Sequence, residues 1–587
     1  MGHHSAKKRQ AELANVFKQY RDKEDGSMTF FGIMVFALIL MAGGIGVDFM
    51  LAEMRRTQLQ DTMDRAVLAA ASLEQQLDPQ LVVEDYIDKS ELSEHLQDIE
   101  VVEGLGFRTV RATADTSVSP LFSNWADFDV FRGEQEQGNA IFELSATSAA
   151  EERIGDVEIS LILDVSGSMN SNNRLPNLKV AAKSFVDTLT ATTEDGKLSI
   201  SIVPYATQVS APESLAQHLN LSSEHSYSNC VNFNSADFNT SSIDPTAPLE
   251  RTMHFSPWST YDGRRYDPKR NVQSPICELA SDNSREIVVL QKDATYMKNF
   301  IDTLWGGGNT SIDIGMKWGT ALLNSSLQPV IQNMVDNGDV HADFAARPNP
   351  TSSSQTLKVI VLMTDGQNTS QGYVEPEYRT GDSNIWWNDE AERYSVYIGE
   401  DTGDEDGDGN TTEPMFFWPY DRSWHDHAYG EGVYEETQQS WECRSYRRNG
   451  SCKRYRKIST VVTVDEPGSA EILTYADLWA FTSVKENRNK HYYRWMDTSQ
   501  AHQDWYEDVV SWVHGSAKDV RTRAICEAAK NDGIVVFSIP FEATSNGKAV
   551  LKDCASSISH YFPVTGTEIE DAFASIASSI RQLRLTQ

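Results

Sequence analysis

The chain has 587 residues, of which 40% are hydrophobic and 10% aromatic, so its length and composition allow several domains with apolar cores. Its formal net charge of −34 argues against nucleic acid as a general partner, because most of this surface would repel a phosphate backbone. Such a charge is compatible with a protein that stays soluble in a salty or calcium-containing exterior.

The first predicted element is a membrane-spanning helix at residues 28–48, after a tail at residues 1–27. Its uncharged run matches one crossing of a bilayer. A cleaved signal peptide is the alternative, but the run exceeds the roughly 7 to 15 apolar residues of such a peptide, and no small-x-small site follows it directly. The positive-inside rule keeps the tail in the cytoplasm and the rest outside. The basic residues that favour this orientation are Lys7, Lys8, Arg9, Lys18, Arg21 and Lys23.

A helix is predicted to continue out of the membrane over residues 49–85. Its apolar residues recur at helical spacing. They are Leu59, Met63, Ala66, Val67 and Ala70. Residues 86–153 then change to short alternating runs, such as residues 107–112, which predict a small strand-bearing connector.

Residues 154–587 alternate predicted strands with predicted helices, which indicates a mostly parallel sheet with helices on both faces. Two long insertions interrupt this pattern, at about residues 207–286 and 367–515. Pro176 suits a first helical turn, and the helix behind it shows an apolar stripe. The stripe consists of Leu178, Ala182, Phe185 and Leu189. The predicted strands are 157–163, 198–203, 357–363 and 533–541.

Oxygen-bearing side chains follow two of these strands and one glycine-rich turn. Asp164, Ser166 and Ser168 follow the first strand, Thr310 follows residues 305–309, and Asp365 follows the third strand. Ligands of doubly wound sheets bind beyond the carboxyl ends of the strands, where these loops should meet. Hydroxyl and carboxylate oxygens suit Mg²⁺, and one coordination position would stay open for a carboxylate from elsewhere. The alternative is a polar turn without a metal.

The order of these residues, D-x-S-x-S followed by Thr and then Asp, resembles the metal-ion-dependent adhesion site (MIDAS) of von Willebrand factor type A (vWA) domains. The resemblance implies a doubly wound, Rossmann-like α/β domain that holds Mg²⁺, or Mn²⁺ or Ca²⁺. Asp164, Ser166, Ser168 and Thr310 would hold the ion directly or through water. Asp365 would hold a bound water and keep the site's charge low enough for the ion to attract an Asp or Glu of a protein partner.

The second insertion is rich in tryptophan and holds nine of the thirteen in the chain. Aromatic side chains at this density can form interface hot spots or stack on a glycan, or they can form the core of a subdomain. The core interpretation is favoured. The nine are Trp386, Trp387, Trp418, Trp424, Trp441, Trp479, Trp495, Trp505 and Trp512.

Two charged segments lie in the same insertion. Asp404, Asp406, Asp408 and Asn410 form an alternating acidic loop that could bind Ca²⁺, although Met415 stands where an EF-hand has its last acid. A solvated acidic loop is the alternative. A basic segment follows, which could dock an acidic partner or lipid headgroups; a hairpin that balances the acidic loop is the favoured alternative. Its cations are Arg444, Arg447, Arg448, Lys453, Arg454, Arg456 and Lys457.

The six cysteines predict disulfides, because an even number in an exported chain is typical of them. Proximity in sequence favours Cys230 with Cys277, Cys443 with Cys452, and Cys526 with Cys554. The second pair conflicts with Asn449-Gly450, which favours a two-residue hairpin with Cys452 opposite Arg447. One of these two interpretations must be wrong.

The order of the parts also resembles TadG-like proteins of the Flp pilus, or tight-adherence (Tad), assembly system. The matching segments are residues 43–48, 59–61, 64–71, 308–312 and 315–319, with Cys526, Gly533, Ile534, Cys554, Ala572 and Phe573. The membrane segment is similar to that of TadE-like pseudopilins too. However, the fifth residue after Gly26 is Phe31 rather than the glutamate of a prepilin-peptidase substrate, so processing is not expected.

This resemblance implies a non-enzymatic protein of the bacterial inner membrane, with its main domain in the periplasm or at the cell surface. Its partners would be pilus-assembly or pilin-like proteins that offer an Asp or Glu to the metal. The alternative function is a surface adhesin that binds a glycan or matrix ligand through the tryptophan-rich insertion. Catalysis is not expected, because the sequence places no general base or histidine beside Ser166 and Ser168.

Overall fold

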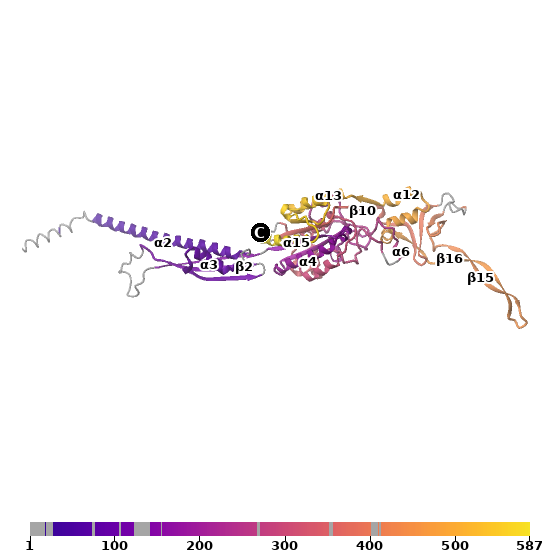
Figure 1. Ribbon diagram of the computed structural model, residues 1–587, viewed down its shortest axis with the longest axis horizontal. Coiled ribbons are helices and arrows are strands. Elements are labelled where there is room, and N and C mark those ends of the chain that lie inside the picture. The colour runs from indigo at the N-terminus through magenta and orange to yellow at the C-terminus, as the bar shows by residue number, and fades with distance from the viewer. Residues whose placement is uncertain are drawn as a thin grey trace, which may run out of the picture. The chain divides into compact units, whose positions relative to one another are not determined.

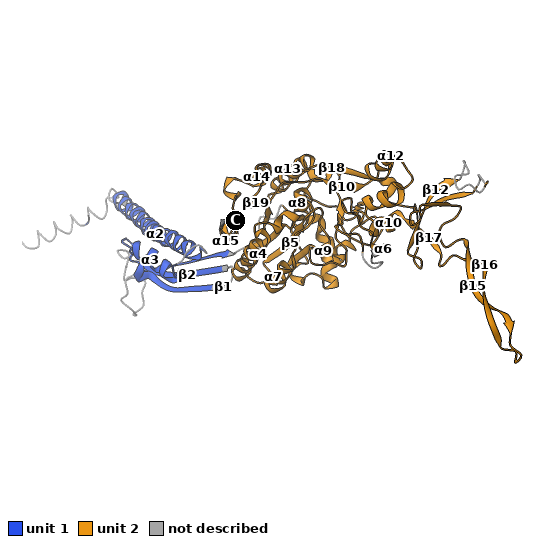
Figure 2. Ribbon diagram, turned by 45° about the vertical axis from the view of Figure 1, so that its right-hand side comes forward, with its two compact units in different colours: residues 1–154 blue, residues 155–587 orange. Residues whose placement is uncertain are grey.

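The computed structural model describes residues 18, 27–72, 77–104, 107–122, 141–153, 155–266, 271–351, 356–400, 409 and 413–586. Contacts divide the chain into two compact units, residues 1–154 and residues 155–587 (Figure 2). The first holds a long apolar helix, and the second mixes strands and helices. The predicted mixed α/β class is therefore confirmed.

Unit 1 begins with α2 (Ser27–Ala71), one continuous helix of 45 residues. It is long and apolar enough to cross a membrane, judged by length and composition. Its N-terminal half exposes large apolar side chains, such as Phe30 and Ile39, which are 75% and 63% exposed. Water disfavours such a surface, so this half needs an apolar environment. The predicted membrane helix and the helix that follows it thus form a single rod.

The C-terminal half of α2 packs on α3 (Pro79–Lys89) and on an antiparallel sheet of strands β1, β2 and β3, in that order. All five apolar residues predicted at helical spacing are buried in this cluster. The helix expected over residues 49–85 is not continuous, because α2 ends at Ala71 and α3 begins at Pro79, a residue suited to a first helical position. The strands are β1 (Leu96–Gly104), β2 (Phe107–Val118) and β3 (Phe142–Arg153).

Unit 2 is built on a five-stranded sheet with the order β19-β9-β4-β5-β8. The first four are parallel and β8 is an antiparallel edge strand. Strands β4 and β5 are buried along almost their whole length, as expected of parallel strands covered on both faces. The strands are β4 (Asp156–Asp164), β5 (Leu198–Tyr205), β8 (Val288–Gln291), β9 (Thr356–Thr364) and β19 (Val535–Pro540).

Helices cover both faces of this sheet, since alternate side chains of β4 enter different apolar clusters. Ile162 joins the first cluster, whereas Leu161 and Leu163 join the second. The first cluster is covered by α8 (Ile312–Ala321), α9 (Gln328–Asn337), α13 (Gly515–Asn531) and α14 (Ser545–Cys554). The second is covered by α4 (Arg174–Ala191), α7 (Ala294–Thr303) and α15 (Glu568–Thr586). Helices α4 and α15, which Figure 1 labels, contact each other.

Helix α4 begins two residues before Pro176, so this proline lies in the first turn. N–H groups in the first turn have no intrahelical acceptor, so the N–H group that proline lacks costs the helix no hydrogen bond. The predicted apolar stripe of this helix is buried in full. Its four residues face the second cluster. The sequence pattern thus located both the helix and the face that it buries.

The first insertion forms short elements, among them α5 (Glu213–Ala216), β6 (Val231–Asn232), β7 (Glu250–Arg251) and α6 (Gly263–Tyr266). Of these, α5 and β6 contribute side chains to the first cluster. The second builds a five-stranded sheet, a strand pair β10–β18 and a long ribbon β15–β16. Its strands are β10 (Gln371–Val374), β11 (Asp382–Asn388), β12 (Arg393–Glu400), β13 (Pro414–Trp418), β14 (Ser423–His425), β15 (Val433–Tyr446), β16 (Cys452–Asp465), β17 (Ala470–Thr474) and β18 (Val510–Val513). Its short helices are α10 (Tyr475–Phe481), α11 (Val484–Asn487) and α12 (Thr498–His502).

Eight of the nine tryptophans of the second insertion lie in or against two apolar clusters of that insertion. Trp479, for example, is fully buried and donates its indole N–H to the carbonyl oxygen of Tyr378 at 2.9 Å. Only Trp441, on the ribbon, is 66% exposed. The interpretation of these residues as the core of a subdomain is therefore confirmed.

The structure joins the six cysteines in the three pairs that sequence proximity favours. The two-residue hairpin expected at Asn449-Gly450 is wrong, because Cys452 pairs with Tyr446 rather than Arg447. Residues 447–451 form a longer turn with a positive φ at Gly450, and register shifts follow Cys443. These shifts bring the Cα atoms of Cys443 and Cys452 to 5.6 Å, within disulfide range.

The second insertion also buries an imidazole whose ionisation makes folding sensitive to acid. Burial, with a smaller effect from Lys490, lowers the pKa of His491 to about 3. The unfolded chain titrates near pH 6.5, so between pH 6.5 and 3 it binds a proton that the folded chain excludes. The free energy of unfolding should therefore fall by about 2 kcal/mol from pH 7 to pH 5 through this residue alone.

His491→Gln should remove this part of the acid sensitivity. Urea unfolding of the full chain at pH 7 and pH 5, followed by tryptophan fluorescence, measures it. The exposed His514 offers a matched control, because His514→Gln should leave the pH dependence as it is. An equal loss of stability in the wild-type chain and in His491→Gln would contradict the prediction.

Candidate functional site

The candidate site lies at the carboxyl ends of two neighbouring parallel strands. Strand β4 ends at Asp164, and strand β9 ends at Thr364, directly before Asp365. The two strands pair in parallel, so their ends meet at the same edge of the sheet. This edge is where ligands of open α/β sheets bind.

Four of the five residues predicted to hold the metal form one connected set of hydrogen bonds. The buried carboxylate of Asp164 accepts the backbone N–H of Ser166 at 2.8 Å. The hydroxyl oxygens of Ser166 and Ser168 lie 3.1 Å apart, and the Ser168 hydroxyl donates to Asp365 Oδ1 at 2.7 Å. The other oxygen of Asp164 accepts the hydroxyl of Thr364 at 2.6 Å, which fixes the orientation of the carboxylate.

The loop that carries Thr310 is held against this set by its backbone. Gly167 N–H donates to the carbonyl of Gly308 at 3.0 Å, and Gly307 N–H donates to the carbonyl of Val165 at 2.9 Å. Gly308 has a φ of +78°, and a Cβ atom there would lie 2.7 Å from the hydroxyl oxygen of Thr207. Only glycine fits this approach without strain, so the glycine-rich turn before Thr310 lies against the Asp164–Ser168 loop. Thr310 itself is buried, and its backbone contacts Thr369 and Lys518 rather than the four connected residues.

Two carboxylates are buried together here. Burial, followed by the negative charge of Asp365, raises the pKa of Asp164 to about 6. Such a carboxylate is stabilised in its charged form by a cation, and hard divalent cations prefer hydroxyl and carboxylate oxygens. The donor set of Asp164, Ser166, Ser168 and Asp365 therefore fits Mg²⁺ chemically.

Arg174 was not foreseen from the sequence, yet it contacts this set directly. Its Nη1 lies 2.8 Å from Asp365 Oδ2, and its Nε lies 2.9 Å from Glu542 Oε2. One guanidinium thus already balances part of the negative charge. Glu542 lies two residues beyond the end of β19, a parallel strand of the same sheet. Its position after a predicted strand could have identified Glu542 from the sequence as a residue near the site.

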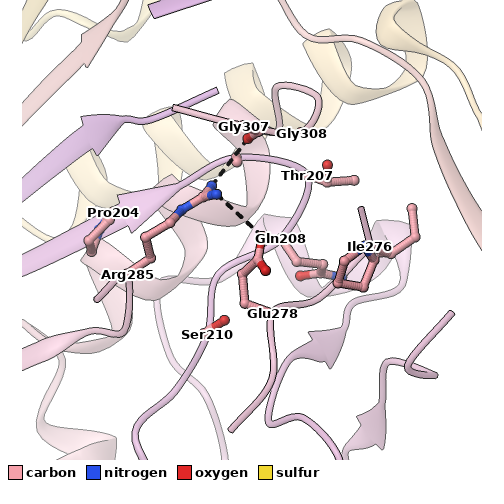
Figure 3. A pocket seen from close by; sticks show the side chains of 11 residues that line it. Pro204, Thr207, Gln208, Ser210, Ile276, Glu278, Arg285, Gly307 and Gly308 are labelled. Atoms are coloured by element: carbon pink, nitrogen blue, oxygen red, sulfur yellow. Dashed lines mark hydrogen bonds and ion pairs between the residues drawn. The ribbon is translucent and has the colours of Figure 1, made fainter. Parts of the chain in front are cut away.

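Arg285 was also not foreseen from the sequence, and it links the Asp164–Ser168 loop to the glycine-rich turn. Its Nη2 donates to the carbonyl oxygen of Gly307 at 3.2 Å, and its Nη1 lies 3.3 Å from Glu278 (Figure 3). Nη2 also donates to the carbonyl oxygen of Val165 at 3.4 Å. Arg285, Glu278 and Gly307 border a cavity of about 10 Å³, about the room of one water molecule. Arg285 acts here as a positioning residue for both loops.

Lys518 of α13 holds the backbone of Thr310 by hydrogen bonds. Its fully buried Nζ donates to the carbonyl oxygens of Thr310 and Thr369, each at 3.1 Å, and to the hydroxyl of Ser311. It also lies 3.9 Å from the buried carboxylate of Asp313. Burial lowers the pKa of Lys518 to about 8. A helix more than 200 residues from Thr310 in sequence thus holds the threonine loop in place.

The second predicted metal site, the acidic loop of Asp404, Asp406, Asp408 and Asn410, lies outside the described residues. Within the described ranges, no group of three or more His, Cys, Asp or Glu side chains is arranged to hold a metal. The hydroxyl-containing cluster at Asp164 is therefore the candidate metal centre of the described chain.

Comparison with known protein families matches the N-terminal segment of the chain. Residues 26–73 match a family described as "Putative Flp pilus-assembly TadE/G-like". The predicted resemblance to TadE/TadG-like proteins is thus confirmed at the N-terminal segment. No curated protein matches the chain.

Several solved structures are similar to the chain. The von Willebrand factor domain of the type V pili tip protein Mfa5 from Porphyromonas gingivalis is 14% identical, with a TM-score of 0.28, over 73% of this chain and 96% of that one. The pilus adhesin SpaC from Lactobacillus rhamnosus GG is 11% identical, with a TM-score of 0.28, over 82% and 33%. The adhesive tip pilin GBS104 from Group B Streptococcus agalactiae is 11% identical, with a TM-score of 0.27, over 72% and 100%. Because these TM-scores are low, the fold and site are assigned from this chain's own strand order and contacts.

Proposed function

We propose that this protein is a membrane-anchored component of the Flp (Tad) pilus assembly machinery. Its unit 2 would be a vWA domain that binds a protein partner through a Mg²⁺ at a MIDAS formed by Asp164, Ser166, Ser168, Thr310 and Asp365. Its N-terminus would lie in the cytoplasm, with α2 in the inner membrane and unit 2 in the periplasm. The match over residues 26–73 supports the pilus system, and the basic residues before α2 support the orientation.

The observation that carries the proposal is the connected cluster at the ends of β4 and β9. Asp164 and Asp365 lie 201 positions apart in sequence, yet both hydrogen-bond within one set that includes two serine hydroxyls. Mg²⁺ keeps an open coordination position when the protein supplies few ligands, and that position would accept a partner's carboxylate. Asp164 and the serines would hold the ion, while Arg174 and Ser168 orient Asp365.

A binding role is proposed rather than catalysis. The hydroxyls of Ser166 and Ser168 contact each other and Asp365, and Asp365 is engaged by Arg174. A serine nucleophile would need a base such as histidine within hydrogen-bond reach. The adhesin alternative loses most of its support, because eight of the nine tryptophans that suggested it serve the core.

The test is a pull-down from bacterial envelope extract with the full chain in neutral-lipid nanodiscs. We expect partners to be captured in Mg²⁺, and to be lost both in EDTA and with Asp164→Ala, because each removes the bridging ion. The partners recovered should include pilus-assembly or pilin-like proteins.

Lys548→Ala is the matched control, since this exposed lysine of α14 has no part in the site. It should retain every partner. Partners retained in both EDTA and Asp164→Ala would contradict metal-bridged recognition. Metal-dependent partners from an unrelated system would contradict the pilus assignment while leaving the metal site intact.

A further inference from the structure

The ribbon of β15 and β16 is an isolated two-stranded element that extends from unit 2 (Figure 2). Its strands pair from Val433 opposite Asp465 to Tyr446 opposite Cys452, and most of their side chains are exposed. A two-stranded ribbon alone is marginally stable in water. The disulfide between Cys443 and Cys452 covalently joins its strands near the far end. The chain thus reinforces an element that adds little to any core.

The far end of this ribbon, residues 441–457, is called here the ribbon tip, and it is strongly basic. It holds seven Lys and Arg residues against one carboxylate, Glu442, a net charge of +6 in a chain of net charge −34. Among the described residues, Arg456 is the one cation of the tip that forms an ion pair, and its partner is Glu442. The basic segment was expected to form a hairpin that balances the acidic loop beside it. The hairpin is confirmed, whereas the acidic loop lies outside the described residues, so the balance of charge stays a prediction. The cations of the tip are exposed on the ribbon.

Three large aromatic side chains lie among these cations. Trp441, Tyr446 and Tyr455 are 66%, 69% and 63% exposed. Water disfavours such exposure, and these three residues join none of the apolar clusters of the described chain. Tryptophan and tyrosine settle at the headgroup level of bilayers, and Lys and Arg are attracted to anionic headgroups.

We propose that the ribbon tip docks on an anionic lipid surface, with its cations on the headgroup phosphates and its aromatic rings at the headgroup level. The tip is the end of an isolated two-stranded ribbon, so it can meet a flat membrane directly, whereas a protein partner would have to supply a groove around it. The charge pattern also sets the orientation. The near end of the ribbon carries Glu435, Glu436 and Asp465, which an anionic surface would repel, so the tip engages first.

The test measures recruitment of the full chain, held in phosphatidylcholine nanodiscs, to separate vesicles in flotation. Vesicles with about 30% phosphatidylglycerol should recruit it, and pure phosphatidylcholine vesicles should not. Changing Arg447, Arg448, Lys453 and Arg454 together to Gln should weaken recruitment by about 600-fold, at about fivefold for each cation. Recruitment by the wild-type chain should also fall as salt rises, because salt screens exposed charges.

A matched control removes the same charge elsewhere on unit 2. Changing Arg265, Arg494, Lys548 and Lys552 together to Gln should leave recruitment within about twofold, because these exposed cations lie outside the ribbon. A second variant keeps every cation and changes Trp441, Tyr446 and Tyr455 to Ser. It should lower recruitment at least tenfold while keeping the salt dependence. Formation of the ribbon disulfide, checked by mass spectrometry, shows that each variant is folded there.

Three outcomes would overturn the proposal. One is no recruitment by the anionic vesicles, which would leave an acidic protein as the ligand of the tip. Another is equal loss in the ribbon variant and its matched control, which would make the effect one of total charge. The third is association between nanodiscs without vesicles, abolished by the ribbon variant, which would identify a second copy of the chain as the occupant.

Discussion

Asp164→Asn is expected to abolish Mg²⁺ binding while the metal-free protein stays at least as stable as the wild type. Asparagine can still accept the N–H of Ser166, and the Thr364 hydroxyl can turn to accept from the new amide. The substitution removes a buried negative charge that lies against Asp365 and whose pKa burial raises to about 6. The same charge is what a divalent cation needs, so affinity should fall by on the order of 100-fold or more.

Arg174→Ala should move the affinity in the opposite direction. Its guanidinium contacts Asp365 at 2.8 Å and so repels a cation bound beside that carboxylate. Removing it should tighten Mg²⁺ binding by about tenfold. Lys183→Ala is the control, since Lys183 also lies on α4 and pairs with Asp302.

Isothermal titration of the full chain in nanodiscs measures the affinities, and thermal unfolding in EDTA measures the metal-free stability. Opposite shifts for the two variants cannot arise from a general loss of fold. Unchanged Mg²⁺ affinity in Asp164→Asn would show that the cluster does not hold the ion.

Lys518→Met is expected to lower the free energy of unfolding of unit 2 by about 3 to 5 kcal/mol. Methionine has nearly the same length, so the main change is the loss of a buried positive charge. The carbonyl oxygens of Thr310 and Thr369 lose their shared donor. Among the described residues, Asp313 then keeps Arg521, 3.9 Å away, as its cation partner. Breaking one side of a buried ion pair is costly because the other charge stays buried.

Urea unfolding followed by tryptophan fluorescence measures this loss. Lys548→Met removes an exposed lysine and should change the free energy of unfolding by less than about 0.5 kcal/mol. A loss below about 1 kcal/mol in Lys518→Met would show that the pair with Asp313 contributes little. In that case the Thr310 loop would be held mainly by Gly307 and Gly308.

Patterns within short stretches of sequence were enough to predict most of the helices and strands of the fold. The apolar stripe of α4, the buried residues of α2 and the strands that end at Asp164 and Thr364 were all predicted from the spacing of apolar side chains. Such spacing reports which face of an element is buried, and burial is the main favourable term in folding. The expected continuous helix over residues 49–85 was wrong, because apolar spacing does not show where a helix stops.

The candidate site was predictable only in part. Its proposed metal-binding residues each follow a strand or a glycine-rich turn, so their type and position could be predicted from the sequence. Arg174, Arg285 and Lys518 gave no such signal, because a cation on a helix or in an insertion usually faces solvent. Their roles depend on which carboxylate or carbonyl group the fold brings beside them.

By itself, the sequence determined the apolar helix, the alternation of strands and helices, and the oxygen-bearing loops, because each depends on residues close together in the chain. Tertiary structure decided that Asp365 shares hydrogen bonds with Ser168 and Arg174, and that the cations of the ribbon tip extend from unit 2. These contacts join residues far apart in the chain or depend on the register of paired strands. Their energies exist only after the sheet has formed, so no local pattern encodes them.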